Sequence, residues 1–269
     1  MWFGAFSQAL PNGGFCSDNS TPGGTSAELQ MRMARSPGRG RGSARFRCSL
    51  RTTICKETAV SRIPLITGDD LSPAQQAVYD RVVSGPRGVV VGPLRAALHS
   101  PELAERWQSF GAFLRYDTEL SLRSRELAII CCGRFWNSPL EWQVHAEVAA
   151  EAGIGEDVIE AIRTACAPAF ETVEDLAVYE FTRELLHNGQ VSEATYQLCL
   201  ETLDKVRLVE LTAVVGYYTL VAMTVNVHNI PPPELVGEPK RMALNHGGQA
   251  PIAPTHLARS VDAPIVRRA

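Results

Sequence analysis

The chain has 269 residues, a formal net charge of −3, 45% hydrophobic residues and 20% charged residues. These values are typical of a soluble globular protein, and the length suffices for one large domain or two small ones. A membrane span needs ~18 to 20 continuous apolar residues. The most apolar stretch, 208–227, is interrupted by Glu210, Gly216 and Asn226, so we do not expect a membrane-spanning segment.

The charge is distributed unevenly along the chain. Residues 1–60 contain eight Lys or Arg and three Asp or Glu, which leaves residues 61–269 with a net charge of −8. Binding to nucleic acid depends largely on basic side chains that neutralise phosphates. An acidic body is unsuited to this, and we exclude nucleic acid as a partner.

The seven cysteines, at positions 16, 48, 55, 131, 132, 166 and 199, follow neither a CxxC pattern nor a zinc-binding pattern. Those beyond residue 60 lie in apolar helical patterns, where cysteine usually acts as a small hydrophobic residue. A reducing compartment fits this usage best, and we expect a cytoplasmic protein.

Residues 1–60 are rich in Gly, Ser, Pro and Arg, with no acidic residue from Leu29 to Lys56. Such a segment buries too little apolar surface to offset its conformational entropy, so we expect a disordered basic tail. Two other interpretations stay open. The segment is Arg-rich and acid-poor like an organelle targeting peptide, and a true start further along, at Met31 or Met33, is equally compatible with the sequence.

Helix start signals recur through residues 61–230. Ser72-Pro73, Ser100-Pro101 and Ser138-Pro139 each place a capping residue before a proline at the first helical position. No alternating strand pattern and no Gly-rich phosphate loop is present. The sequence therefore predicts an all-α domain with helices at 73–83, 94–98, 102–115, 122–135, 139–151, 156–165, 173–187, 192–203 and 206–225.

The last predicted helix, 206–225, is apolar on nearly all faces. This pattern predicts burial by the rest of the chain or by another subunit. The sequence after Asn229 loses its periodicity and is punctuated by Pro and Gly, so we expect a loose C-terminal tail over 231–269.

Three residues between 121 and 150 are candidates for acid/base chemistry. Glu141 and His145 are four apart and share one helix face, and the preceding helix carries Glu126. Imidazole is suited to proton transfer near neutral pH, and a nearby carboxylate fixes its tautomer. We therefore predict Glu126, Glu141 and His145 as the catalytic residues.

Structural and metal-binding alternatives compete with this interpretation. Ser138-x-x-Glu141 matches a capping box, His145 is compatible with a buried structural histidine, and Glu126 with a helix-terminal charge. The chain would then be a non-catalytic oligomeric helical protein. The same two carboxylates and imidazole also suit zinc, manganese or iron.

The runs HSPELAERWQSFGAFLR, RELAII, LEWQVH and VELTAVVGYYTLVA together resemble the carboxymuconolactone decarboxylase family, within the alkylhydroperoxidase-D-like superfamily. The resemblance covers about residues 63–229, and its most specific part is Glu126 to His145. It implies an all-α domain that assembles into homo-oligomers, with trimers and hexamers as the expected states.

The peroxidase branch of that superfamily uses a CxxC pair four residues ahead of the histidine. In this chain Ser138 and Glu141 stand at those two positions. Neither side chain forms a disulfide, so thiol-dependent peroxide reduction through this motif is not expected. The neighbours Cys131 and Cys132 do not replace the pair, because consecutive residues on a helix point about 100° apart.

The decarboxylase branch carries a run like Glu141-Trp142-Gln143-Val144-His145. The resemblance implies cofactor-free loss of CO2 from a carboxylated muconolactone, a step in the catabolism of aromatic compounds. His145 would deliver or relay a proton, Glu126 would orient it, and Glu141 would act as a second acid/base. Related acid/base sets are also compatible with isomerisation, hydration or ring closure.

An anionic substrate needs a cation, and the arginines nearest in sequence are Arg134 and Arg125. We name Arg134, Trp142, Ser138 and His99 as candidate substrate-binding residues. We expect no metal, no cofactor and no membrane partner.

Overall fold

The computed structural model describes residues 61–232, 244 and 252–255. Within these residues the chain forms eight α-helices and no β-strand, so the predicted all-α fold class is confirmed. The predicted tails, 1–60 and most of 231–269, lie outside the described residues. The helices are α1 Pro73–Ser84, α2 Pro93–Ala97, α3 Pro101–Tyr116, α4 Leu122–Phe135, α5 Pro139–Glu151, α6 Glu156–Arg163, α7 Val173–Asn188 and α8 Glu193–His228.

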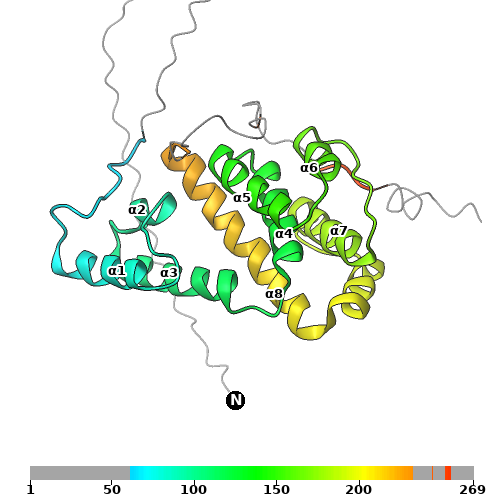
Figure 1. Cartoon of the computed structure of the whole chain (residues 1–269), viewed down its shortest axis with the longest axis horizontal. Helices are drawn as coiled ribbons and strands as arrows, with labels where there is room; N and C mark the ends of the chain where they lie inside the picture. Colours follow the sequence, from blue (N-terminus) through cyan, green and yellow to red (C-terminus); the bar gives the residue numbers. More distant parts are fainter. Residues whose placement is uncertain (1–60, 233–243, 245–251, 256–269) are drawn as a thin grey trace, which may run out of the picture. The chain divides into compact units, whose positions relative to one another are not determined.

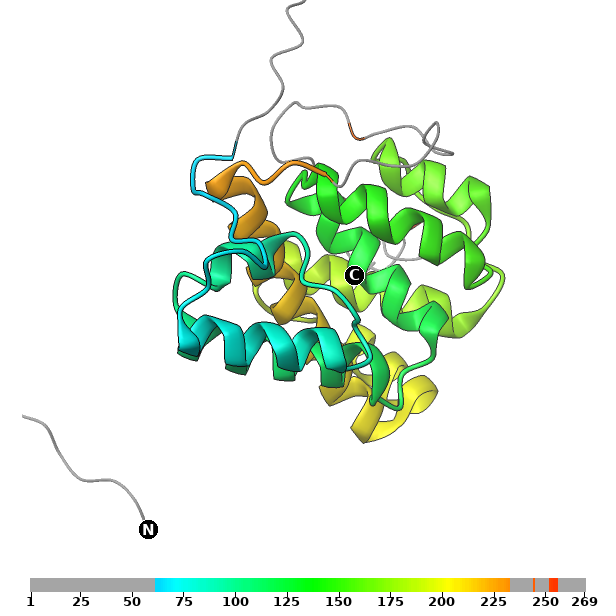
Figure 2. The same ribbon diagram turned by 60° about the vertical axis from the view of Figure 1, so that its left-hand side comes forward.

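The long helix α8 runs between two groups of helices. Figure 1 shows α1, α2 and α3 on one side of it and α4 to α7 on the other, and Figure 2 shows the same order after rotation. The helix is broken at Asp204, where φ is 68° and ψ is 179°. The two helices predicted at 192–203 and 206–225 are therefore the two segments of α8 on either side of this break.

Local sequence signals explain most of the helix starts. Ser72 accepts a hydrogen bond from the Gln75 amide, and the Gln75 side chain accepts one from the Ser72 amide, which completes a capping box at α1. Ser121 caps α4 through the Ser124 amide. The predicted cap at Ser72 is confirmed, whereas the side chains of Ser100 and Ser138, which were also predicted as caps, make no capping hydrogen bond.

The core centres on α4, which packs against α5, α7 and α8. Its apolar residues from Leu127 to Cys132 are fully buried. Gly133 allows α5 to approach closely, because a β-carbon at this position would lie 3.3 Å from the Trp142 amide nitrogen and 3.4 Å from the Glu141 β-carbon. The close approach brings Glu141 and the residues after it towards α4.

By length and composition, α8 is the one helix of the described part that is long and apolar enough to cross a membrane. Half of its most apolar window is buried within the chain. The buried residues include Glu210, and they pack against α4, α7, α2 and α3. Packing within the chain therefore explains a large part of the apolar character of α8.

The described residues 252–255 lie against α7, although the sequence predicts a loose tail there. The Tyr179 hydroxyl donates to the Ala253 carbonyl at 2.6 Å, and the Thr255 amide donates to Glu180 at 2.8 Å. Ile252 is buried. Polar partners on α7 and burial of one apolar side chain hold these four residues, which periodicity alone does not reveal.

Glu210 of α8 fixes the connection between α3 and α4. Its Oε2 accepts hydrogen bonds from the backbone amides of Glu119, at 2.8 Å, and Leu120, at 3.3 Å. Glu210 is itself buried. A buried carboxylate with two backbone donors anchors this turn, and thereby the end of α3 and the beginning of α4.

Replacing Glu210 with Gln removes the negative charge and keeps the shape of the side chain. We expect the free energy of unfolding to fall by about 1 to 3 kcal/mol, because hydrogen bonds to charged groups are stronger than those to neutral ones. Urea denaturation measures the change. Glu201→Gln, at an exposed position of the same helix, is the control and should change stability by less than about 0.5 kcal/mol.

Candidate active site

A buried hydrogen bond joins α4 to α5 at the centre of the molecule. His145 Nδ1 lies 2.7 Å from Glu126 Oε2, and both side chains are almost completely buried. A carboxylate removed from water needs a close partner to offset the cost of burial. The pair therefore ties the orientation of the imidazole ring to the position of α4.

Arg115 of α3 contacts the other ring nitrogen. Its Nη2 lies 3.1 Å from His145 Nε2. A guanidinium has donors and no acceptor, so Nε2 must accept and the ring proton must be on Nδ1, where it is donated to Glu126. The contacts select the neutral Nδ1-protonated tautomer, with a basic nitrogen at the Arg115 side.

Glu141 completes the group. Its Oε2 lies 3.6 Å from His145 Nε2, beyond hydrogen-bond distance but within one small movement of it. Burial has the largest effect on the pKa of Glu141 and raises it, the charge of Arg115 opposes this, and the charge of Glu126 raises the pKa further. A carboxyl with a raised pKa is suited to donate a proton.

Tyr218 of α8 forms one wall beside the histidine. Its ring meets the imidazole edge to face, with 5.1 Å between the ring centroids. Its hydroxyl accepts a hydrogen bond from Arg115 Nε at 3.1 Å. Burial raises the pKa of Tyr218, so the side chain stays a phenol and keeps its own hydroxyl proton.

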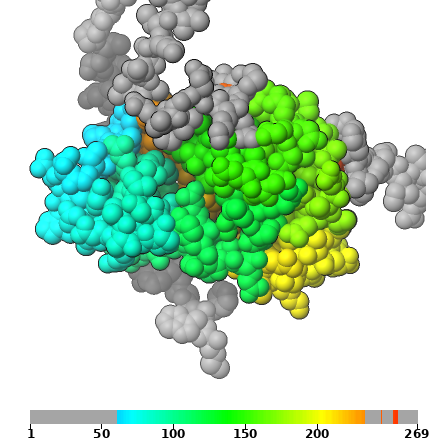
Figure 3. All heavy atoms as spheres, viewed as in Figure 1, coloured from blue at the N-terminus to red at the C-terminus, as the bar shows by residue number. Residues whose placement is uncertain are grey.

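These groups open onto a cavity of about 630 Å³. It is lined by Glu141, His145, Arg115 and Tyr218, together with apolar residues such as Val90, Leu140 and Val221. Figure 3 shows a furrow between the cyan and green helices, with orange atoms of α8 at its base. The volume suits a small organic molecule.

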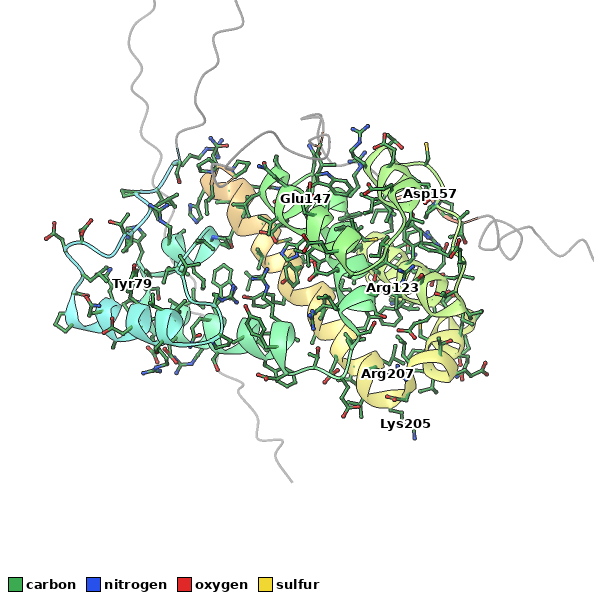
Figure 4. All side chains as sticks on the ribbon, in the orientation of Figure 1. Tyr79, Arg123, Glu147, Asp157, Lys205 and Arg207 are labelled. Atoms are coloured by element: carbon green, nitrogen blue, oxygen red, sulfur yellow. The ribbon has the colours of Figure 1, made fainter. Side chains whose placement is uncertain are left out.

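The opposite wall comes from α1, α2 and the loops around them. Tyr79, labelled in Figure 4, lines the cavity from α1. Arg95 also lines it and donates to the carbonyls of Leu65, at 3.1 Å, and Ile66, at 3.1 Å. Arg95 therefore fixes the 65–68 segment that closes this side.

Arg87 is the third arginine of the cavity, and two of its three guanidinium nitrogens make no hydrogen bond within the described part of the chain. Its Nε and Nη2 are buried and have no hydrogen-bond partner among the described residues. Buried donors without partners are costly. Because this cation faces the cavity, it is available to an anionic group of a bound molecule.

Gly111 of α3 leaves room for the Tyr217 hydroxyl beside this arginine. A β-carbon at residue 111 would lie 2.0 Å from the Tyr217 hydroxyl oxygen and 3.1 Å from Arg87 Nη2. No larger residue fits at position 111 unless Tyr217 moves. The glycine thus sets the positions of two side chains that line the cavity.

The structure brings together the three residues predicted to be catalytic. The capping-box alternative for Ser138 and Glu141 is wrong, because the Ser138 side chain makes no capping hydrogen bond and Glu141 lines the cavity instead. Within the described residues, no group of three His, Cys, Asp or Glu side chains is arranged to hold a metal ion. Arg115 lies instead at the ring nitrogen that faces the cavity.

The structure places the four candidate substrate-binding residues away from the cavity lining. Trp142 and Ser138 are buried, and Arg134 is half-buried on α4. His99 is exposed, with Nε2 at 2.8 Å from the Pro64 carbonyl. Their role in substrate binding stays a prediction, which this cavity does not support.

Sequence reasoning missed Arg115, Arg87 and Tyr218. Arg115 is 30 residues from His145, and Tyr218 is 73 residues from it along the chain. No spacing rule connects them to the histidine. Arg87 lies between Pro86 and Gly88, outside any periodic pattern. The only feature of the sequence that could have indicated a role in binding is its position as a cation directly before the apolar segment Val89 to Val91.

No protein-family model and no curated protein matches the chain. Several solved structures resemble it, including two peroxidase-related proteins. An uncharacterised peroxidase-related protein from Silicibacter sp. has a TM-score of 0.53 and 13% identity, over 67% of this chain and 95% of that chain. An alkylhydroperoxidase-D core, an uncharacterised peroxidase-related protein from Ralstonia eutropha, has a TM-score of 0.53 and 14% identity, over 65% and 93%.

At this level of identity the likeness shows the fold alone. The chain has the alkylhydroperoxidase-D-like helical fold. This agrees with the fold class predicted from the sequence.

The raised pKa of Glu141 predicts a pH dependence of stability. A carboxyl whose pKa is higher in the folded state binds protons more tightly there, so folding loses stability as pH rises from the ordinary value of 4.5 through the folded value. Glu141→Gln removes this loss, which is about 1.4 kcal/mol for each tenfold difference in proton affinity between the folded and unfolded chains. Denaturant unfolding from pH 4 to 8 should show the variant gaining on the parent as pH rises.

The exposed Glu151→Gln serves as the control and should keep a constant difference from the parent across this range. A constant difference for Glu141→Gln as well would show that the Glu141 carboxyl titrates normally.

Proposed function

We propose that the protein is a cofactor-free acid/base lyase that removes CO2 from a small carboxylated lactone, as a 4-carboxymuconolactone decarboxylase does. The observation that carries the proposal is a buried Glu126–His145 pair beside a carboxyl of raised pKa, at the wall of a cavity that also holds Arg115 and Arg87. This set combines a proton donor, an oriented imidazole and cations for an anionic substrate.

The reaction breaks the bond between the ring carbon and the carboxylate carbon. The electron pair of that bond moves into the conjugated lactone carbonyl, and CO2 leaves. Negative charge develops on the carbonyl oxygen, where a guanidinium stabilises it. A proton must then reach a carbon of the conjugated system to give the neutral enol-lactone.

Glu141 supplies that proton, because its pKa is raised and it lines the cavity. His145 replaces it. The ring nitrogen 3.6 Å from the Glu141 carboxyl takes a proton from solvent in the open cavity, which ends its hydrogen bond from Arg115. It then passes a proton to Glu141, and Glu126 stabilises the imidazolium that exists in between. One proton is consumed and one CO2 is released per turnover.

Arg87 binds the substrate carboxylate that is retained in the product, because its buried donors have no partner in the described part of the chain. Arg115 is already engaged with His145 and Tyr218, so it stabilises the developing oxyanion next to the acid/base group. Two cations thus have separate tasks.

The peroxidase-related names of the two similar structures raise the alternative of peroxide reduction. A thiol must ionise to attack a peroxide. Cys131 and Cys132 are fully buried, and burial raises the pKa of both thiols. Neither lines the cavity. These observations favour acid/base chemistry over thiol chemistry at this site.

Ultraviolet absorbance of 4-carboxymuconolactone with the purified full chain tests the proposal. We expect turnover by the parent and a loss of about 10²- to 10⁴-fold in kcat for His145→Ala, the usual contribution of a general acid/base. His228→Ala is the matched control, because His228 ends α8 and is outside the cavity lining, and it should keep full activity. A folded parent without turnover would rule out this substrate.

Arg87→Met tests the recognition of the carboxylate. Loss of a charge-assisted hydrogen bond should raise KM by about 10- to 100-fold, with a smaller effect on kcat. Arg106→Met removes a cation from an exposed position of α3 and should leave both parameters unchanged. An unchanged KM in the Arg87 variant would contradict the proposed anion site.

A further inference from the structure

The exposed face of α8 carries an apolar stripe with the spacing of a coiled coil. Its residues follow one another at alternating intervals of three and four, and they are Val206, Val209, Ala213, Gly216, Leu220, Met223 and Val227. All except Ala213 are exposed. Apolar residues at this repeat normally face another helix, yet no helix of the described chain covers them.

The face has no charge along this stripe. Between 208 and 227 the single charged residue is Glu210, which is buried and bonded to the α3–α4 turn. An exposed apolar face without charges marks an interaction surface.

We propose that α8 pairs with α8 of a second copy of this chain in an antiparallel coiled coil about a twofold axis. This proposal is independent of the proposed function. In antiparallel coiled coils, each layer places one position of the repeat against the other. With the axis at the level of residue 218, the layers match Gly216 with Leu220, Ala213 with Met223 and Val209 with Val227 of the second copy.

The volumes support this arrangement. The two central layers each join a small residue to a large one, which fills space evenly as closely packed helices require. A β-carbon added at Gly216 would meet nothing within 4 Å in the chain itself, so the space beside this residue is open to a partner. A parallel pair in register would instead set Gly216 against Gly216 and Leu220 against Leu220, with a gap and a crowded layer in succession.

The ends of the stripe agree with the antiparallel direction. Lys205, labelled in Figure 4, directly follows the break of α8 at Asp204 and is exposed. In the antiparallel pair it lies just beyond the last turn of the partner's helix, where unpaired carbonyl groups attract a cation. From Val209 to Val227 the contact is roughly 27 Å long, at 1.5 Å per residue.

A twofold pair restricts the assemblies that are allowed. The protein must form a dimer or an even-numbered oligomer built from dimers, such as a hexamer made of three pairs. Of the two states expected from the family resemblance, this favours the hexamer over the trimer.

Light scattering and sedimentation of the full chain provide the first test. We expect an even multiple of the mass of one chain for the parent. Val209→Glu and Val227→Lys should each abolish the pairing, because each buries an unpaired charge in the seam. Both positions are highly exposed in one chain, at 70% and 60%, so circular dichroism should show unchanged helix content.

Mixing the two variants tests direction and register. In the proposed register, each mixed dimer contains two layers that join residues 209 and 227. In one layer the introduced Glu faces the introduced Lys, and in the other Val209 faces Val227. The mixture should therefore recover the mass of the pair, whereas neither variant does so alone. A parallel pair would recover nothing, since residues 209 and 227 would then never meet.

Val173→Glu is the control, because Val173 is equally exposed, at 59%, but lies on α7 outside the stripe. It should keep the mass of the parent. A monomeric or trimeric parent, a parent whose mass survives both seam variants, or a mixture that stays unpaired would each overturn the proposal. Binding of a monomeric parent to lipid vesicles, lost in Val209→Glu, would also overturn it by assigning the stripe to a membrane surface.

Discussion

The site depends on one buried hydrogen bond, from His145 Nδ1 to Glu126 Oε2. The bond fixes the ring, and Arg115 at Nε2 fixes which nitrogen carries the proton. The negative charge of Glu126 and the positive charge of Arg115 lie at the two sides of the imidazole ring and balance each other. Burial of Glu126 is tolerable because partners of opposite or complementary polarity lie close to it. The charge of Arg87 is not part of this balance, so an anionic ligand in the cavity would neutralise it.

This constraint explains why three helices converge on one point. Glu126 comes from α4, His145 from α5 and Arg115 from α3, so α4 and α5 must approach closely and α3 must end near both. Gly133 allows the first contact, and Glu210 anchors the turn that links α3 to α4. Residues far from the site thus set its distances, and in the proposed mechanism a displacement of about 1 Å would have a large effect on catalysis.

The sequence predicted the helices and the proximity of Glu126, Glu141 and His145, because both depend largely on local spacing. Ser-Pro starts and a period of 3.6 located the helices, and the i,i+4 relation of Glu141 and His145 located the site. The same local rule suggested a capping box at Ser138, and only the direction of the Glu141 side chain decided against it. Two local interpretations of one glutamate cannot be separated without tertiary structure.

The cations of the site could not be predicted in this way. Arg134 and Arg125 were chosen as the arginines nearest in sequence, whereas Arg115 reaches His145 from another helix and Arg87 comes from an aperiodic loop. Their contributions depend on how α2 and α3 pack against α8, and these contacts join residues about 100 positions apart, as Arg115 and Tyr218 do. Chemistry assembled across such distances leaves no periodic trace in a single sequence.

The two faces of α8 relate the cavity to the proposed assembly. Tyr217, Tyr218 and Val221 line the cavity, while Gly216 and Leu220, their immediate neighbours in sequence, lie on the exposed stripe. A helix is stiff, so a contact on one face of α8 also restricts the position of the residues on its other face. If α8 pairs as proposed, the second copy adds no residue to the cavity but fixes the wall against which His145 and Arg115 are placed. Assembly and site geometry then depend on the same helix, because the apolar character of α8 serves both.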